Sequence, residues 1–259
     1  KKKKKDACLA NSFRISDDIK PCMGETGLIT DIAAAALRFA GPGCYLDLDS
    51  LEVGVDHGCP NESPHAGNVS SNELNFANWR AQLALWAVIN AQLVLGNDLP
   101  NMDNATRALL LSPGYIRVSQ DALGVPGRLL RIGDRNSAEL WAKPLADPPR
   151  SFACVLWFRN QTQAIKHRAS QRLRAGSVEL DFRDLGFVGK AEVVDIWSNS
   201  SHGIFVDTYN WKAKGGDLGA AEFVYVRPVA GASQNTGCSA WGGGNCSTAA
   251  QPNKDGMFW

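Results

Sequence analysis

Several signals are missing from this 259-residue sequence. No run of apolar residues reaches the roughly 18 that a membrane-spanning helix needs, so we predict no membrane span. The cysteines form no Cys-x-x-Cys pair, which excludes zinc ribbons and thioredoxin-type redox motifs. A Gly-x-Gly-x-x-Gly or P-loop motif for a nucleotide and a Gly-x-Ser-x-Gly elbow for a serine hydrolase are also missing. We therefore predict no cofactor.

Basic charge is scarce outside one short run. The chain has 27 Lys+Arg and 26 Asp+Glu, but five of the basic residues are Lys1–Lys5. Without them the balance is 22 against 26, or −4, which excludes a generally basic nucleic-acid binder. The residues from Asp6 to Asp18 are too polar for the apolar part of a signal peptide. We expect any secretory signal to lie upstream of Lys1–Lys5, a run that suggests a truncation or an added segment.

Cysteines and glycosylation motifs indicate the secretory pathway, with an extracellular, lysosomal or vacuolar destination. The seven cysteines are an odd number, which implies one free thiol or a partner outside the chain. Asn-x-Ser/Thr motifs, which matter only in a secreted chain, occur at six positions: Asn61, Asn68, Asn104, Asn160, Asn199 and Asn245. The alternative is a cytosolic protein that is rich in Ser and Asn.

The sequence changes character near Gly127. Before this point short apolar strands alternate with helices, a pattern typical of parallel β/α units. The spacing predicts strands at Leu9–Phe13, Cys44–Leu48 and Gln92–Leu95, and helices at Gly27–Phe39, Glu73–Ile89 and Ala105–Leu111, the last capped by Asp103.

After Gly127 the apolar residues recur with period two. Seven segments read as strands, which predicts an antiparallel sandwich. They are Leu129–Ile132, Ala138–Pro144, Phe152–Phe158, Ser177–Phe182, Ala191–Trp197, Ile204–Tyr209 and Ala221–Val226. The Gly- and Ser-rich residues 231–259 read as a tail.

Carboxylates follow the predicted strands of the first part. Asp17 and Asp18 come shortly after the first strand, and Asp47 and Asp49 end the second and share one face of it. In parallel β/α folds the carboxyl ends of strands carry the catalytic residues, and paired acids suit the hydrolysis of glycosidic bonds. Helix caps or salt bridges to Arg14 would account for the same residues equally well.

Two other groups of residues have weaker claims. His57, Cys59 and His65 could bind a metal, but no fourth ligand is apparent and Cys59 suits a disulfide better, so we predict no metal. Trp211 and Trp241 stand in loop-like sequence and could stack on a sugar, although isolated surface aromatics are common.

Five segments, taken in chain order, match the pattern of one enzyme family. Asn11–Ile19 is similar to N-S-W-R-x-x-x-D-I, and Ala40–Gly54 to A-G-P-G-G-W-N-D-P-D-M-L-E-V-G. Trp79–Leu99 is similar to Y-R-A-H-F-x-L-W-A followed by A-P-L-L-x-G-x-D-L. Ser119–Gly124 is similar to N-Q-D-P-L-G, and Asp195–Trp197 matches D-L-W. From about residue 11 to 228 the chain therefore resembles glycoside hydrolase family 27, the α-galactosidases and α-N-acetylgalactosaminidases.

The resemblance implies an α/β fold in which a (β/α)8 barrel precedes an all-β antiparallel sandwich. Three β/α units are too few for a closed barrel, so they would be about strands six to eight, with the first five absent. The implied domains are a partial catalytic barrel over residues 1–126, a sandwich over 127–230 and a tail over 231–259.

The resemblance also implies a retaining mechanism that uses two aspartates. It places the general acid/base at Asp18, or at Asp17 if the alignment shifts by one residue. The nucleophile belongs to a K-x-D segment on the fourth barrel strand, and no such strand segment exists in this chain. We expect the 259-residue chain alone to be inactive for that reason.

The implied substrate-binding residues are Arg14, Tyr45, Asp47 and Asp49, and the implied substrates are glycans or oligosaccharides with terminal α-linked galactose or N-acetylgalactosamine. The segment Cys44–Ser50 departs from the family pattern at five positions, which favours a non-catalytic carbohydrate-binding relative as the alternative. A small open-sheet protein complete at 259 residues is a third reading. The resemblance leaves both a monomer and a homodimer open.

Overall fold

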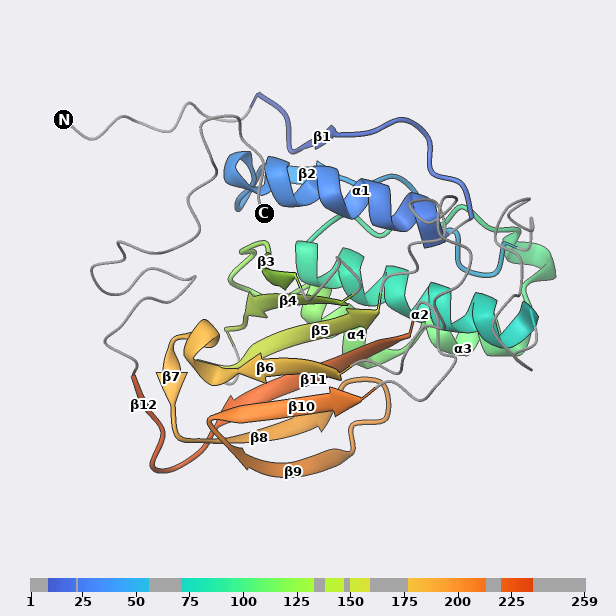
Figure 1. Cartoon of the computed structure of the whole chain (residues 1–259). Coiled ribbons are helices and arrows are strands. Elements are labelled where there is room, and N and C mark those ends of the chain that lie inside the picture. Colours follow the sequence, from blue (N-terminus) through green and yellow to red (C-terminus); the bar gives the residue numbers. More distant parts are fainter. Residues whose placement is uncertain are drawn as a thin grey trace, which may run out of the picture.

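A computed structural model describes residues 9–21, 23–55, 71–132, 138–146, 150–158, 177–212 and 220–234 (Figure 1). The predicted tail beyond residue 234 and the loop that carries His57, Cys59 and His65 lie outside these ranges, and so does Trp241. Among the described residues no helix combines the length and the apolar composition that crossing a bilayer demands.

The helices occupy the first half of the described chain. They are α1 (Met23–Ala36), extended by a 3₁₀ turn at Leu37–Phe39, then α2 (Ser71–Ile89), α3 (Asn104–Leu110) and α4 (Pro113–Ser119). Asp103 caps α3 as the sequence predicts, since its Oδ1 accepts hydrogen bonds from the backbone N–H groups of Ala105 and Thr106 at 2.8 and 2.9 Å.

Twelve strands make up four sheets among the described residues. The strands are β1 (Ser12–Arg14), β2 (Tyr45–Asp47), β3 (Arg128–Ile132), β4 (Ala138–Pro144), β5 (Phe152–Phe158), β6 (Ser177–Asp181), β7 (Phe187–Val188), β8 (Lys190–Asp195), β9 (Ser201–Val206), β10 (Thr208–Lys212), β11 (Ala221–Pro228) and β12 (Ser233–Gln234). Six of them form one antiparallel sheet in the order β3-β4-β5-β11-β8-β9, and β10-β6 and β12-β7 are antiparallel pairs. The predicted antiparallel arrangement after Gly127 is confirmed.

The large sheet is covered on both faces, so its central strands are apolar throughout. Successive side chains of β5 alternate between two cores, with Val155 and Trp157 in one and Cys154 and Leu156 in the other. The second core is closed by the β6–β10 pair, which contributes Leu180 and further apolar side chains. This is the second layer of the predicted sandwich.

Helix α2 covers the opposite face of the large sheet. Its residues from Ala81 to Ile89 are buried, and Trp86 and Val88 belong to the same apolar cluster as Trp141 and Phe223 of the sheet. Helix α1 and the β1–β2 pair lie on the far side of α2 from the sheet (Figure 1). One continuous core therefore joins the helical part of the chain to the antiparallel part.

The prediction of a third strand at Gln92–Leu95 is wrong. The structure has only an isolated parallel bridge between Leu51 and Leu95, with the Leu51 N–H donating to the Val94 carbonyl at 2.7 Å. Val94 and Leu95 are 50% and 42% exposed, so this apolar segment gains little from burial among the described residues. A strand forms only where a neighbour pairs with it over several residues, and here the pairing lasts for one.

The predicted single strand Ile204–Tyr209 is two strands in different sheets. The break falls at Asp207, whose φ of +60° is a left-handed conformation that Asp tolerates better than most residues. The Asp207 N–H donates to the Gly189 carbonyl at 2.9 Å, and its Oδ1 accepts from the Gly189 N–H at 2.7 Å. This pair of bonds turns the chain from β9 of the large sheet into β10 of the small one.

The other boundaries agree with the sequence to within a few residues, apart from elements that the sequence analysis did not name. Helix α4 was missed although Ser112 and Pro113 form an ordinary start signal. The two-residue strands β7 and β12 are too short for a periodicity to be visible.

Candidate functional site

Two short parallel strands bring the predicted site residues together. Strands β1 and β2 pair with Phe13 opposite Leu46 and Arg14 opposite Asp47. Because parallel strands end at the same edge, the segments that follow Arg14 and Asp47 leave the sheet side by side. The structure thus brings two segments more than 30 residues apart in sequence into contact.

Arg14 is the centre of the resulting cluster. Its Nη2 donates to Asp18 Oδ1 at 3.2 Å and also to Asp49 Oδ2, and its Nε donates to the Ser16 carbonyl at 3.1 Å. One guanidinium therefore holds a carboxylate from each of the two segments. The Arg14 side chain is 35% exposed, so it remains accessible to a ligand.

Asp49 is the most constrained member of the cluster. Its backbone has a φ of +72°, which is unusual for a residue other than glycine. Its carboxylate accepts hydrogen bonds from the backbone N–H groups of Ile19 and Ser50, each at 2.7 Å. Burial alone would raise the pKa of Asp49, but these two N–H groups and the Arg14 guanidinium together lower it below its usual value. Asp49 is therefore an anion that the fold keeps in place.

Helix α2 supports this strand end from behind. The Trp86 Nε1 donates to the Asp49 carbonyl at 3.1 Å. The Gln82 side chain accepts from the Glu52 N–H at 3.0 Å and donates to the Ser50 carbonyl at 3.4 Å. Three hydrogen bonds from one helix thus fix the backbone that presents Asp49.

The remaining predicted residues differ in their surroundings. Asp18 is fully exposed apart from its bond to Arg14, with a side-chain exposure of 101%, and Asp17 is also exposed. Asp47 Oδ1 accepts from the Asp49 N–H at 2.9 Å and so shapes the turn after β2. The Tyr45 hydroxyl lies against Gly124, where an added Cβ would stand 2.7 Å from it.

Asn97 and Asp98, which follow the third predicted strand, make their own local contacts. Asp98 Oδ2 accepts from Asn101 Nδ2 at 2.6 Å. Asn97 Nδ2 lies against Gly54, 3.5 Å from where a Cβ would stand. The structure therefore groups Arg14 with Asp18, Asp47 and Asp49, and it leaves Asp98 in a turn of its own.

Known proteins are similar to this chain over the segments that form the cluster. The model of the family described as Alpha galactosidase A (Melibiase_2) matches residues 10–121, which include the whole Arg14 cluster. Among curated proteins, α-galactosidases of Oryza sativa subsp. japonica and Cyamopsis tetragonoloba are each 29% identical over 195 and 198 residues, or 74% and 76% of this chain. These matches support membership of glycoside hydrolase family 27.

Solved structures agree on the fold of this chain. Alpha-galactosidase I from Mortierella vinacea matches 84% of it with a TM-score of 0.66 and 20% identity, and the match covers 53% of that protein. A family 27 β-L-arabinopyranosidase from Geobacillus stearothermophilus matches 86% with a TM-score of 0.66 and 17% identity, covering 46% of that protein. At these identities the likeness concerns the fold alone.

The chain spans less than half the length of these two curated relatives. The matched region is 39% of the rice protein and 40% of the Cyamopsis protein. Functions that the longer relatives place in their remaining residues are not represented in the described part of this chain.

Sequence reasoning missed two polar groups of this chain. One is the buried Lys143 of β4, and the other is a cluster of Asp195, His202 and Glu222 on three neighbouring strands. The three members of the cluster are up to 27 positions apart in sequence. Only the sheet order reveals that they meet.

Proposed function

We propose that this chain is the C-terminal part of a retaining family 27 glycosidase that hydrolyses terminal α-linked galactose or N-acetylgalactosamine. Its helical part would supply about strands six to eight of a (β/α)8 barrel over residues 1–126, followed by the sandwich over 127–230 and the tail over 231–259. The observation that carries the proposal is the Arg14 cluster, in which one guanidinium joins Asp18 and Asp49 at the edge where two parallel strands end.

In this proposal Asp18 is the general acid and then the general base. Protonated Asp18 gives its proton to the departing glycosidic oxygen while a second aspartate attacks the anomeric carbon. Asp18, now ionised, takes a proton from the water that releases the sugar. Its bond to Arg14 and its full exposure suit a group that meets the substrate directly.

Arg14, Asp49, Asp47 and Tyr45 would bind the sugar. An arginine and an anchored carboxylate offer the donors and acceptors that sugar hydroxyls need. The low pKa of Asp49 keeps it an acceptor at any pH at which the enzyme works. The rigid support from Trp86 of α2 would hold this acceptor in position.

The nucleophile would come from residues upstream of this chain, on the fourth barrel strand. Retaining enzymes place their two carboxyl groups about 5–5.5 Å apart. The letters Lys4-Lys5-Asp6 do match K-x-D, but they stand in a run of lysines only eight residues before Arg14 and lie outside the described residues. Asp6 is therefore a poor substitute for a residue on a distant strand.

The decisive test uses the longer protein that contains this chain, defined by reading the source transcript upstream of Lys1. We expect that protein to hydrolyse a p-nitrophenyl α-galactoside, and the 259-residue chain not to. In the longer protein D18N should lower kcat by about 10²–10⁴, whereas D17N should leave it within a few-fold of the wild type. A dinitrophenyl leaving group needs no proton, so with it D18N should recover a rapid first step.

Three outcomes would contradict this assignment. Turnover by the 259-residue chain would refute the need for an upstream nucleophile, and loss of that turnover in D6N would move the role to Asp6. Equal activity of D18N and the wild type would remove Asp18 from the mechanism. A loss in D18N that the dinitrophenyl substrate does not relieve would indicate a structural role.

A non-catalytic sugar-binding relative is the second candidate. It is favoured by the changes within Cys44–Ser50, where the family pattern has Asn and Met and this chain has Leu46 and Ser50. It predicts that the longer protein binds galactose in calorimetry but releases no product. The arabinopyranosidase among the neighbours is a reason to test β-L-arabinopyranosides as well.

We place the protein in the secretory pathway and propose that it is glycosylated. The disulfide-bonded state of Cys44 supports an oxidising compartment. Two of the Asn-x-Ser/Thr asparagines, Asn104 and Asn199, are exposed, one at the first residue of α3 and one in the turn after β8. Secretion from a eukaryotic host and a mass decrease on glycosidase treatment would support this, and the decrease should be smaller in N104Q/N199Q. A wild-type mass that glycosidase treatment leaves unchanged would contradict it.

A further inference from the structure

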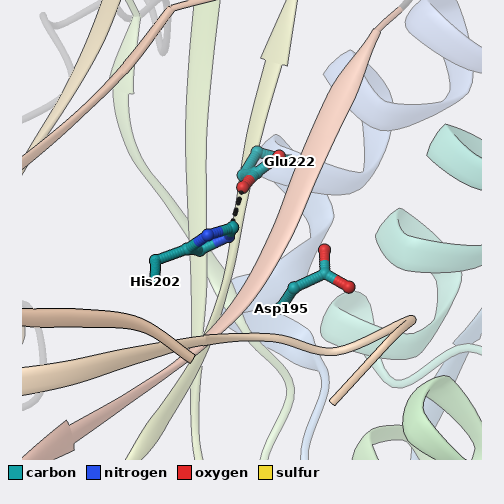
Figure 2. A group of neighbouring side chains, drawn as sticks. All are labelled: Asp195, His202 and Glu222. Atoms are coloured by element: carbon teal, nitrogen blue, oxygen red, sulfur yellow. Dashed lines mark ion pairs between the residues drawn. The ribbon is translucent and has the colours of Figure 1, made fainter. Parts of the chain in front are cut away.

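A histidine and two carboxylates converge at one end of the large sheet, outside the Arg14 cluster. Asp195 is the last residue of β8, His202 the second of β9 and Glu222 the second of β11, and these strands are neighbours in the order β11-β8-β9. One ligand atom from each residue lies within 4.8 Å of the other two (Figure 2). Figure 2 shows the imidazole directed at Glu222, with Asp195 beside both.

Neighbouring groups hold these side chains in place. His202 Nε2 lies 2.8 Å from Glu222 Oε1, and the Tyr209 hydroxyl donates to the same oxygen at 3.3 Å. The Tyr209 ring stacks on the imidazole, with centroids 5.9 Å apart and an angle of 15° between the planes. Asp195 Oδ1 accepts from the Ser198 N–H at 2.6 Å and from the Ser198 hydroxyl at 2.7 Å. Neither of these two bonds uses Asp195 Oδ2.

The charges around the cluster do not balance. Arg80 of α2 interacts electrostatically with both Asp195 and Glu222, and its guanidinium lies 5.0 Å from the centroid of a Trp197 ring. Two carboxylates and one guanidinium leave one negative charge when His202 is neutral. All three ligand residues are only partly buried or exposed, so a cation can reach them from solvent.

We propose that Asp195, His202 and Glu222 bind a divalent transition-metal cation of the zinc class. One imidazole nitrogen and two carboxylate oxygens are a ligand set that Zn²⁺ accepts, with water in the fourth position. Mg²⁺ and Ca²⁺ prefer oxygen ligands alone and should bind more weakly. On binding, His202 Nε2 exchanges its hydrogen bond to Glu222 for a bond to the metal; its proton then moves to Nδ1 if the ring is neutral, or to solvent if both nitrogens were protonated.

The geometry is close to what such a site needs. Ligands about 2.0–2.2 Å from one Zn²⁺ lie roughly 3–3.6 Å from each other in a tetrahedral arrangement. The present separations between the ligand atoms, from 2.8 Å up to 4.8 Å, bracket this range, so side-chain movements of about an ångström would complete the site. A bound cation would join the turn between β8 and β9 to the start of β11. The role is therefore structural, and it is independent of the glycosidase proposal.

The competing reading is a plain ion pair between His202 and Glu222 with Asp195 nearby. The purified 259-residue chain, stripped with EDTA, separates the two readings. We expect Zn²⁺ to bind with a stoichiometry of one in calorimetry and to raise Tm, and Mg²⁺ at the same concentration to leave Tm unchanged. The variants H202Q, E222Q and D195N should each weaken Zn²⁺ binding at least tenfold.

A matched control addresses the other histidines of the chain. H57Q/H65Q/H167Q removes the three other histidines, which lie outside the described residues, and it should bind Zn²⁺ as the wild type does. Loss of binding in this control, or wild-type binding by H202Q, would refute the site. X-ray absorption of the zinc-loaded wild type requires no variant: we expect one imidazole and oxygen ligands, and a sulfur ligand would overturn the proposal. Absence of Zn²⁺ binding to the wild type at millimolar concentration would do so too.

Discussion

Replacing Lys143 by methionine should destabilise the protein in a way that depends on pH. Lys143 is fully buried in β4 and faces the ends of two helices. Its Nζ donates to the carbonyls of Val118 at 2.5 Å and Ala87 at 3.4 Å, and to Asn90 Oδ1. The ammonium therefore satisfies the last turns of both α2 and α4, where a cation is favoured by about 0.3–1 kcal/mol per helix end.

K143M removes the donor and leaves buried acceptors without a partner. Each unpaired acceptor costs about 1–3 kcal/mol. The wild type bears an opposing cost, because burial lowers the pKa of Lys143 from 10.5 to about 8 despite the attraction of Asp121. A pKa difference of this size corresponds to about 3 kcal/mol. The cost of leaving these acceptors unpaired is larger than the cost of burying the ammonium, so we expect K143M to lose about 2 kcal/mol of unfolding free energy at pH 7.

The pH dependence follows from the same pKa. Because the folded pKa lies below the unfolded value, the unfolded wild type binds more protons between pH 8 and 10.5. The wild type therefore gains stability from this group as pH rises through that window, by up to about 3 kcal/mol. K143M has no such group, so the difference between the two proteins should widen with pH.

Urea unfolding followed by tryptophan fluorescence at pH 7, 8, 9 and 10 measures this difference. The control is K190M, which makes the same change at an exposed lysine of β8 and should stay within about 0.5 kcal/mol of the wild type. A K143M deficit that does not change between pH 8 and 10 would refute the buried-ammonium account. A deficit no larger than that of K190M at pH 7 would refute the role of the hydrogen bonds.

Three further predictions concern other positions in the described part of the chain. G114A should lower unfolding free energy by about 2 kcal/mol or more, because the new Cβ would stand 2.1 Å from the Ile196 carbonyl, while G41A, with open space around it, should be nearly neutral in the same urea titration. Burial raises the pKa of the Cys154 thiol, so iodoacetamide should label it only after unfolding, and labelling of the native chain seen by mass spectrometry would contradict this. Because the pKa of Asp49 is lowered in the folded protein, its contribution to stability is present above pH 3.8 and is lost as pH falls through the folded pKa. The wild type should therefore exceed D49N in unfolding free energy near neutral pH, and this difference should vanish on acidification. A difference that persists at pH 2 would argue against this account.

The sequence predicted the antiparallel part well because its strands are bounded by turn residues. Ala138–Pro144 and Phe152–Phe158 match the observed strands β4 and β5 at both ends. Periodicity alone could not separate β9 from β10, since the apolar pattern runs through Asp207 without interruption. The break depends on the pairing of Asp207 with Gly189, which is a contact between distant residues.

The faces of β4 show a second limit of sequence reasoning. Polar residues that alternate with apolar ones normally face solvent, but Glu139 and Lys143 are 2% and 0% exposed. Glu139 accepts from the Trp141 Nε1 at 2.8 Å, and Lys143 binds helix carbonyls. A strand that is covered on both faces can bury polar side chains wherever partners exist, and the partners of Lys143 are supplied by helices that the strand sequence does not contain.

For the candidate site, the residues followed from the family pattern and their grouping from the topology. Two strand ends with carboxylates predict proximity only if the strands are adjacent and parallel, which β1 and β2 are. Asp98 does not join the cluster, because the segment before it forms only the bridge between Leu51 and Leu95 and no strand. The roles of Asp18 and Arg14 in catalysis stay predictions.

Trp86 gives the molecule a property that neither part would have separately. Its indole N–H holds the carbonyl of Asp49, and its ring is packed in the core that α2 shares with the large sheet. Loosening the sheet therefore removes the backing of the carboxylate cluster in the same event. Amide hydrogens around Asp49 and those of β5 should exchange with solvent at similar rates under conditions that favour global opening, so that the Arg14 cluster and the sandwich respond to heat or denaturant as one cooperative unit.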